Sequence, residues 1–209
     1  MAEKTEKVKV KTPKFRVSFA HVFSPQPALE EGDKPKYNLV ALFPKGTDLK
    51  ALKRAAMEVG KKKFGAKWKT DGKTWPVGFK NPFRDAAEKE DLEGYTPGTT
   101  FCTFGANVDY PPTVFDKDVS RLDPLDAADR AKFYSGCWAV ATINVFAFEH
   151  PKGGKGIAFG LLGVQKVKDD AKFGGGAGAD ASDFEAVEDE SDNVDNFGAE
   201  EDGDQDGGF

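Results

Sequence analysis

The strongest constraint on folding in this sequence is a change of charge near residue 173. Residues 173–209 contain thirteen Asp and Glu and no Lys or Arg, whereas residues 1–172 contain all 30 Lys and Arg against 22 acidic residues. The formal net charge of −5 is therefore the sum of a body at +8 and a C-terminal segment at −13. The acidic segment holds too few apolar residues to offset the entropy lost on ordering the chain. We expect one folded domain over 1–172 and a disordered acidic tail over 173–209.

The body is large enough to fold without covalent or metal crosslinks. A domain of about 170 residues buries roughly 70% of its unfolded surface. The cysteines, Cys102 and Cys137, are expected to be free thiols, and Met1 to Lys14 is charged where a signal peptide would be apolar. The longest apolar run, 138–148, has about half the length of a membrane-spanning helix. We expect an intracellular chain without a membrane segment.

Alternating apolar and polar residues predict several β-strands. The segments 15–23 and 37–43 have the period of two that is typical of a half-buried strand. Further strands are expected at 99–108, 136–148 and 156–168, between turns that are rich in Pro and Gly. Because these strands do not alternate regularly with helices, they favour a small barrel over an α/β sheet.

One main helix is expected after the second strand. Thr47 or Asp48 can cap its start, and Gly60 lies near its expected end. Its apolar face is formed by Leu49, Leu52, Ala56 and Val59, so we expect it to pack on the sheet. A short second helix is expected where Asp123 can cap and Pro124 fits the first turn. The predicted fold is an OB-fold-like antiparallel β-barrel with one principal α-helix.

The strand that starts at Trp138 has two different faces. One face is small and apolar and suits a tight barrel interior: Ala139, Ala141, Ile143, Val145 and Ala147. The other face carries larger residues, which either form a stacking surface or receive the helix. We expect Phe146 and Phe148 to pack under the helix and Trp138 to be available for a ligand.

Residues 45–84 combine positive charge with aromatic rings. This segment holds twelve Lys or Arg and three acidic residues, for a local net charge of +9. Single-stranded nucleic acid is bound by this combination, because cations follow the phosphates and exposed rings stack on unpaired bases at about 1–3 kcal/mol each. The alternative is that the rings belong to the core beneath a solvated lysine-rich loop: Trp68, Trp75, Phe79 and Phe83. The segment as a whole predicts a nucleic-acid-binding surface.

The candidate site residues follow from this pattern. Phosphate contacts are assigned to the basic residues Lys61, Lys62, Lys63, Lys67, Lys69, Lys80 and Arg84. Base stacking is assigned to Trp68, Trp75, Phe83 and Trp138. The histidines and cysteines lack the spacing of a zinc site, and the acidic residues of 116–129 lack the Gly and terminal Glu of a calcium loop. We therefore expect a binding protein without catalytic residues, metal or cofactor.

Four segments of the body resemble the single-stranded DNA-binding proteins of tailed bacteriophages, which have an OB-type barrel. They are Asn81-Pro82-Phe83-Arg84-Asp85, Leu92-Glu93-Gly94-Tyr95, Tyr134-Ser135-Gly136-Cys137-Trp138, and Gly156 to Leu161 with Val164-Gln165. The family's Phe-Gly-Gly-Gly hinge, which precedes an acidic tail ending in an aromatic residue, is similar to 173–176 and Phe209. One difference is that the family's usual Arg-Asp-Gly-Asp turn reads Arg84-Asp85-Ala86-Ala87 here.

The resemblance implies sequence-independent binding of single strands during phage DNA replication or recombination, in the cytoplasm of the infected bacterial host. It implies no catalysis. It also implies that the tail competes with DNA for the basic surface and contacts replication proteins such as a DNA polymerase or helicase. The tail residues expected to bind these partners are Phe184, Phe197, Asp202, Asp204, Asp206 and Phe209.

Two other functions fit parts of the sequence. An acidic-tailed scaffold or chaperone would bind basic proteins through its tail without affinity for DNA, but it would not require the basic and aromatic residues of 45–84. Single-stranded RNA is a nearer alternative, because stacking and phosphate contacts do not distinguish the sugars unless a group reads the 2′-hydroxyl.

Overall fold

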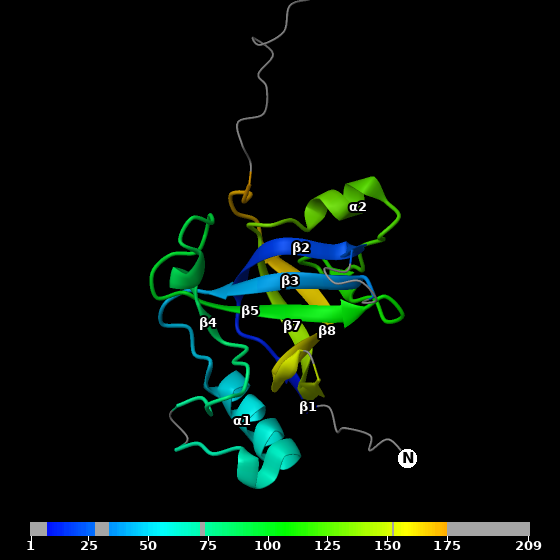
Figure 1. Ribbon diagram of the computed structural model, residues 1–209. Coiled ribbons are helices and arrows are strands. Elements are labelled where there is room, and N and C mark those ends of the chain that lie inside the picture. Colours follow the sequence, from blue (N-terminus) through cyan, green and yellow to red (C-terminus); the bar gives the residue numbers. More distant parts are fainter. Residues whose placement is uncertain (1–7, 28–33, 72–73, 152, 175–209) are drawn as a thin grey trace, which may run out of the picture. The chain divides into compact units, whose positions relative to one another are not determined.

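The structure is a computed structural model that describes residues 8–27, 34–71, 74–151 and 153–174 (Figure 1). The strands of this part are β1 (Val8–Lys11), β2 (Phe15–Gln26), β3 (Lys36–Phe43), β4 (Arg84–Asp85), β5 (Thr100–Asn107), β6 (Thr113–Phe115), β7 (Trp138–His150) and β8 (Gly154–Lys168). The helices are α1 (Lys50–Phe64) and α2 (Ala127–Lys132), with short 3₁₀ turns η1 (Gly65–Lys67) and η2 (Ala86–Lys89).

Five of these strands close into a barrel. β2 pairs with β3, β3 with β5, β5 with β8, and β8 with β7, and β7 returns to β2 at Arg16↔Trp138. The β5–β8 pairing is parallel and the other four are antiparallel. A five-stranded barrel with non-sequential neighbours is the OB-type architecture. The expected fold class, a mainly β barrel with one main helix, is confirmed.

Alternation along the strands places one set of side chains inside the barrel. The small apolar face expected on β7 is buried from Ala139 to Ala147. Large residues from the other strands fill the remaining space, with Phe15, Leu39, Phe43 and Phe104 exposing 1% of their surface or less. The interior is therefore filled by side chains, so any ligand must bind on the outside of the barrel.

Helix α1 lies at one end of the barrel, where it contacts β1, β7 and β8 (Figure 1). Its buried face includes Leu52, Ala56 and Val59, as expected, and the Asp48 carboxylate accepts a hydrogen bond of 2.9 Å from the Lys50 amide. The helix does not end at Gly60 but continues to Phe64. Gly60 is instead a packing residue, because a Cβ there would lie 2.3 Å from the Trp68 ring.

A second apolar cluster lies outside the barrel, where the chain from β4 to β5 folds over β3 and β5. It contains Val40, Leu42, Ala86, Tyr95 and Phe101, with Phe173 packed against it. In the turn that differs from the family pattern, Asp85 caps η2 by accepting a hydrogen bond of 3.0 Å from the Ala87 amide. Ala86 is fully buried there and contributes to the packing of this cluster.

The start of the second helix corrects one local expectation. The second helix begins three residues later than expected, because Asp126 rather than Asp123 accepts the hydrogen bonds of its first turn. Asp123 instead caps the preceding turn at the Leu125 amide, 2.8 Å away. Cys102 and Cys137 are both buried free thiols, and burial raises the pKa of Cys137 to about 11. In the described ranges, no helix is long and apolar enough to cross a membrane.

Candidate nucleic-acid interface

The aromatic residues of the basic segment fall into two groups. Trp68 and Phe79 are core residues, 5% and 8% exposed, whose ring centroids lie 4.7 Å apart. The Trp68 ring also stacks on Phe64 at 5.7 Å beneath α1. The assignment of Trp68 to base stacking is therefore wrong, because both faces of its ring are covered by the protein. For this residue the core alternative is the correct one.

Trp75 and Phe83 are half-buried at the edge of the same aromatic cluster. The Trp75 indole donates a hydrogen bond of 3.0 Å to the Phe79 carbonyl, and its ring lies 5.2 Å from that of Trp68. The Phe83 ring packs edge to face on Phe159 at 5.5 Å. Each ring therefore offers a partial surface to a ligand, and their stacking role stays a prediction.

Trp138 lies apart from the basic segment, at the start of β7. Its indole donates a hydrogen bond of 2.8 Å to the Asp170 carboxylate, and the Arg16 guanidinium lies 5.9 Å from its ring. This hydrogen bond holds the pKa of Asp170 below its usual value. The helix α1 contacts the opposite part of the sheet, beside β1 and its partner residues 142–145 of β7. Trp138 thus contacts Asp170, just before the acidic segment, and the structure does not bring it together with the lysines of α1.

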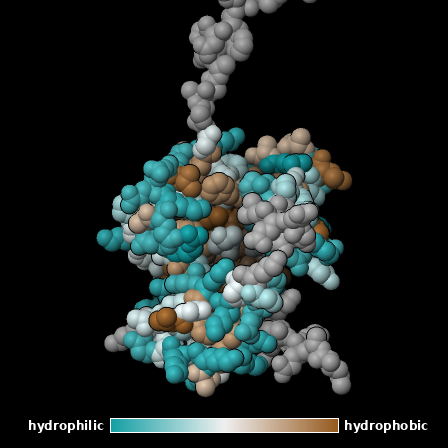
Figure 2. All heavy atoms as spheres, viewed as in Figure 1, coloured by the Kyte–Doolittle hydropathy of each residue, from teal (hydrophilic) through white to brown (hydrophobic). Residues whose placement is uncertain are grey.

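The predicted phosphate-binding cations are exposed and come from several elements. Lys61, Lys62 and Lys63 lie in the last turn of α1, with Lys67 and Lys69 after it. Lys80 pairs through its backbone with β8, and Arg84 forms an ion pair with Glu88. Hydrophilic residues accordingly cover the end of the molecule that holds α1 (Figure 2). The predicted tail residues Phe184, Phe197, Asp202, Asp204, Asp206 and Phe209 lie outside the described residues.

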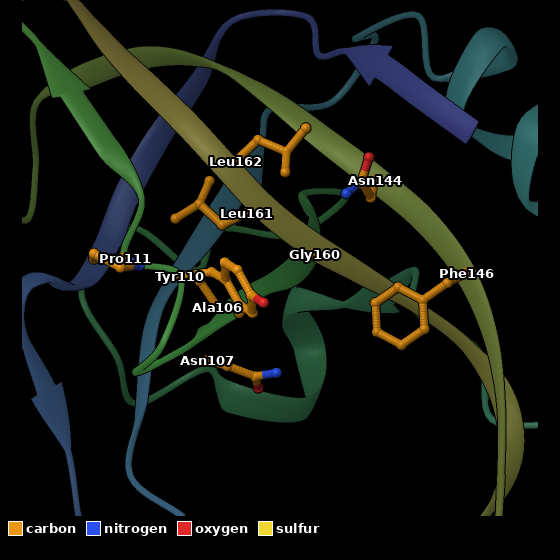
Figure 3. A pocket seen from close by; sticks show the side chains of 10 residues that line it. Ala106, Asn107, Tyr110, Pro111, Asn144, Phe146, Gly160, Leu161 and Leu162 are labelled. Carbon is orange, nitrogen blue, oxygen red and sulfur yellow. The ribbon is translucent and has the colours of Figure 1, made fainter. Parts of the chain in front are cut away.

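A groove on the outside of the barrel was not predicted from the sequence. It has a volume of about 420 Å³ and lies over β5, β7 and β8, beside the loop that follows β5 (Figure 3). Gly105 and Gly160 belong to its lining, and Phe146, Tyr110 and Leu162 project around them. The Tyr110 ring is 77% exposed and Leu162 is 39% exposed. Phe146 lines this groove instead of packing under α1, which corrects the expectation for that residue.

Strand register explains how residues distant in sequence reach this groove. Asn38 of β3 pairs with Gly105 of β5, Gly105 pairs with Gly160 of β8, and Gly160 pairs with Asn144 of β7. Residues in register across neighbouring strands point to the same face of a sheet. A row of amide side chains and glycines therefore crosses four strands on the outer face.

The two glycines of this row are not required by the fold itself. Neither has a positive φ. A Cβ at Gly105 would approach only the Tyr37 carbonyl, at 3.7 Å, and one at Gly160 would meet Phe146 and Asn144 at ordinary contact distances of 3.5 and 3.6 Å. Glycine weakens a strand interior and often marks a place where a ligand approaches the backbone closely. Because Gly105 and Gly160 have no side chains, the floor of the groove is open to a planar group such as a nucleic-acid base.

Lysines surround this groove on the same face. Lys9 of β1 pairs with Asn144, and Lys11 pairs with Thr142, so both side chains share the outer face with the groove. Lys36 of β3 pairs with Asn107, which lines the groove. Aromatic walls, an open floor, amide groups and peripheral ammonium groups are what a single strand requires, because bases stack while cations follow the phosphates. In the described segments, no three His, Cys, Asp or Glu side chains gather closely enough to hold a metal ion.

A sequence signal for this groove was present but weak. Each of the strands β5 and β8 has a glycine at an outward position, in a segment otherwise rich in apolar residues. Glycine in a strand is usually read as a bulge or a bend, and only the register shows that these two meet. The lysines of β1 lie in the charged N-terminal segment, where a lysine at every second position does not by itself indicate a binding surface.

Comparisons with known proteins agree with this architecture. A family model described as the ssDNA-binding protein of Enterobacter phage Enc34 matches residues 8–194. Protein p50 of the Acyrthosiphon pisum secondary endosymbiont phage 1 is 30% identical over 181 residues, which cover 85% of this chain and 93% of that protein.

Two solved structures extend the comparison to the fold. The single-stranded DNA-binding protein of bacteriophage Enc34 in complex with ssDNA matches with a TM-score of 0.62 and 27% identity, over 79% of this chain and 89% of that chain. The single-stranded DNA-binding protein gp2.5 of bacteriophage T7 shares the fold at 13% identity, with a TM-score of 0.53, over 85% of this chain and 93% of that chain.

Proposed function

The chain belongs to the family of the Enterobacter phage Enc34 ssDNA-binding protein, and we propose that it binds single-stranded DNA without sequence preference during phage DNA replication or recombination. A member of this family is a binding protein and not an enzyme. Its place of action is the cytoplasm of the infected bacterial host.

The groove carries this proposal. Unpaired bases enter it and stack against Phe146 and Tyr110, above the glycine floor of β5 and β8. Asn144 and Asn107 donate to or accept from base edges, and since an amide can do both, they suit any base. A duplex has no unpaired base to insert, so the groove favours single strands.

Two sets of lysines are proposed to contact phosphates. One set, Lys9, Lys11 and Lys36, lies beside the groove. The other set, at the end of α1 and in the segment that follows it, is Lys61, Lys62, Lys63, Lys67 and Lys69. Five other residues remain predicted contacts of the same DNA strand: Lys80, Arg84, Trp75, Phe83 and Trp138. The acidic tail is proposed to compete with DNA for these cations and to recruit replication partners such as a polymerase or helicase.

The primary experiment measures binding of the full-length protein to fluorescent oligo-dT by anisotropy. Matched duplex and oligo-U are the competitors, at several salt concentrations. Salt-sensitive binding that excess duplex does not displace supports the proposal. Displacement by oligo-U at equal concentration would show that the protein does not distinguish DNA from RNA, and absence of binding at low salt would refute nucleic-acid binding.

Substitution Gly160→Val tests whether the groove is the site. Valine fills the floor beside Phe146, and its higher strand propensity should keep or raise the unfolding temperature. We expect affinity for oligo-dT to fall about tenfold or more, corresponding to the loss of one stacked base. Val167→Ile, which enlarges a residue of β8 beyond the groove, is the control. Unchanged affinity of Gly160→Val would place the DNA elsewhere.

Glutamine variants separate the two lysine sets. On single strands the logarithm of affinity changes with the logarithm of salt concentration by about 0.7 for each phosphate contact. Replacing Lys9, Lys11 and Lys36 should therefore reduce the slope by about 2. Replacing Lys61, Lys62 and Lys63 should reduce the slope equally only if the DNA strand also crosses α1. An unchanged slope in this variant would mean that these three lysines do not contact the DNA.

A further inference from the structure

Phe19 is held in an unusual backbone conformation on the same face as the groove. Its φ is +48°, and the pairing of β2 with β3 shifts register between Ser18 and His21. A β-bulge of this kind re-aims a side chain, and an aromatic residue seldom adopts a positive φ, where glycine is relaxed. The Ala20 amide donates a hydrogen bond of 3.1 Å to the Ser135 hydroxyl, which fixes the backbone after the bulge.

The conformation does not serve to bury the Phe19 ring. The side chain is 42% exposed and belongs to neither apolar cluster of the molecule. A residue that packs poorly and strains its backbone costs stability, so the strain needs another reason. Strained residues of this kind gather at binding sites, where the surrounding structure holds a side chain ready for a ligand.

One cation, Lys89, lies beside the exposed ring. The Lys89 ammonium is 5.6 Å from the centre of the Phe19 ring and 5.5 Å from that of Phe101, and among the described residues it forms no ion pair. The Arg84 guanidinium lies 4.8 Å from the Phe101 ring. An exposed ring beside an ammonium group is the arrangement that binds a base and its phosphate together.

The strand register connects Phe19 to the groove. Ser18 pairs with Val40 of β3, which pairs with Thr103 of β5, two residues before Gly105. Neighbouring strands are about 4.8 Å apart, so β2 lies roughly 10 Å from β5 across the sheet. A DNA strand that runs from the groove floor at Gly105 toward β2 therefore passes over Thr103 and reaches Phe19.

We propose that Phe19 stacks on an unpaired base adjacent to those in the groove, while Lys89 contacts the neighbouring phosphate. This inference rests on the proposed single-strand function and extends it to a second base site on β2. The occupant is one nucleotide of the same DNA strand, because the site combines an aromatic face with an ammonium group and shares the outer face of the sheet with the groove.

Substitution Phe19→Gly separates a binding role from a structural one. Glycine relaxes the positive φ while removing the ring, so the variant should unfold at or above the wild-type temperature. Its affinity for oligo-dT should nevertheless be about tenfold weaker. Val119→Gly is the matched control, because Val119 also has a positive φ, +68°, and lies in the turn after β6. This control should gain stability and keep its affinity.

Further variants complete the test. Phe19→Trp should bind oligo-dT at least as tightly as wild type, and Lys89→Gln should reduce the salt slope by about 0.7. Wild-type affinity in Phe19→Gly, with Gly160→Val still impaired, would overturn the second site and leave the groove intact. Unfolding of Phe19→Gly at a markedly lower temperature would show that the ring is structural, which also overturns the inference. If the wild-type protein binds no single strand, the proposed function itself fails.

Discussion

Gly60 and Trp68 are in such close contact that a methyl group at Gly60 cannot be accommodated without movement. A Cβ there would lie 2.3 Å from one carbon of the indole and 2.4 Å from another. Helix propensity alone predicts that Gly60→Ala stabilises α1 by about 1 kcal/mol. Overpacking costs about 1–3 kcal/mol, and here it meets a ring that is itself enclosed by Phe64 and Phe79.

Because the helix-propensity gain offsets part of the overpacking cost, we expect Gly60→Ala to lower the free energy of unfolding by up to about 2 kcal/mol, as measured by urea denaturation. Ala51→Gly, at an exposed position of α1, is the control that measures helix propensity without overpacking. A more stable Gly60→Ala protein would mean that the Trp68 ring moves freely, and it would reopen the question of whether that ring can reach a ligand.

The last described segment, 169–174, is attached to the barrel as a separate element. Asp169 accepts hydrogen bonds from Lys117 and Lys166, and these hold its pKa well below the usual range. Asp170 accepts from the Trp138 indole, which lowers its pKa likewise. Beyond them the Phe173 ring packs under Arg16, whose guanidinium is 4.6 Å from the ring centre.

This attachment should depend on pH. Both carboxyl groups have a lower pKa in the folded state than in the unfolded state, so their stabilising contribution is present above about pH 4 and is lost as pH falls further. We expect the Trp138 indole N–H resonance to move only below pH 4 in a ¹⁵N NMR titration from pH 7 to pH 2.5. Asp170→Asn keeps an acceptor oxygen but cannot titrate, so a resonance that still moves equally in this variant would assign the change to another group.

The elements show what a single sequence can and cannot predict. Strands such as β7 were predictable because a period of two extends over the whole segment from Trp138, and one face is uniformly small and apolar. The end of α1 was not predictable from the sequence. Glycine commonly ends a helix, and only the structure shows that Gly60 is instead required by the Trp68 ring packed against it.

Single positions within the site were harder still. Trp68 and Trp75 lie in a segment without regular periodicity, where neither pattern nor composition separates a core ring from a surface ring. The groove depends on the register of β5, β7 and β8, which brings Gly105, Gly160 and Asn144 into one row from three distant segments. The positive charge of the body was predictable from composition. Its distribution between lysines beside the groove and lysines at the end of α1 was not.

Over the whole molecule the opposite charges of body and tail are the dominant electrostatic feature. Residues 175–209 carry all thirteen acidic residues of the predicted tail, so removing them changes the formal net charge from −5 to +8. Truncation should follow Gly174 and not precede Phe173, because Phe173 packs against the second apolar cluster. If the acidic segment occupies the same cations as DNA, a body with this charge binds a polyanion more strongly once that segment is removed.

We expect the truncated protein to bind oligo-dT more tightly than the full chain at low salt. The difference should shrink as salt rises, because the Debye length falls from about 10 Å at 0.1 M to about 3 Å at 1 M. A full-length variant whose thirteen tail acids are replaced by Asn and Gln is the decisive control, since it keeps the length of the tail and removes only its charge. If charge is the cause, this neutral variant binds like the truncated protein. If it binds like wild type, the tail does not compete through its charge, and this prediction is contradicted.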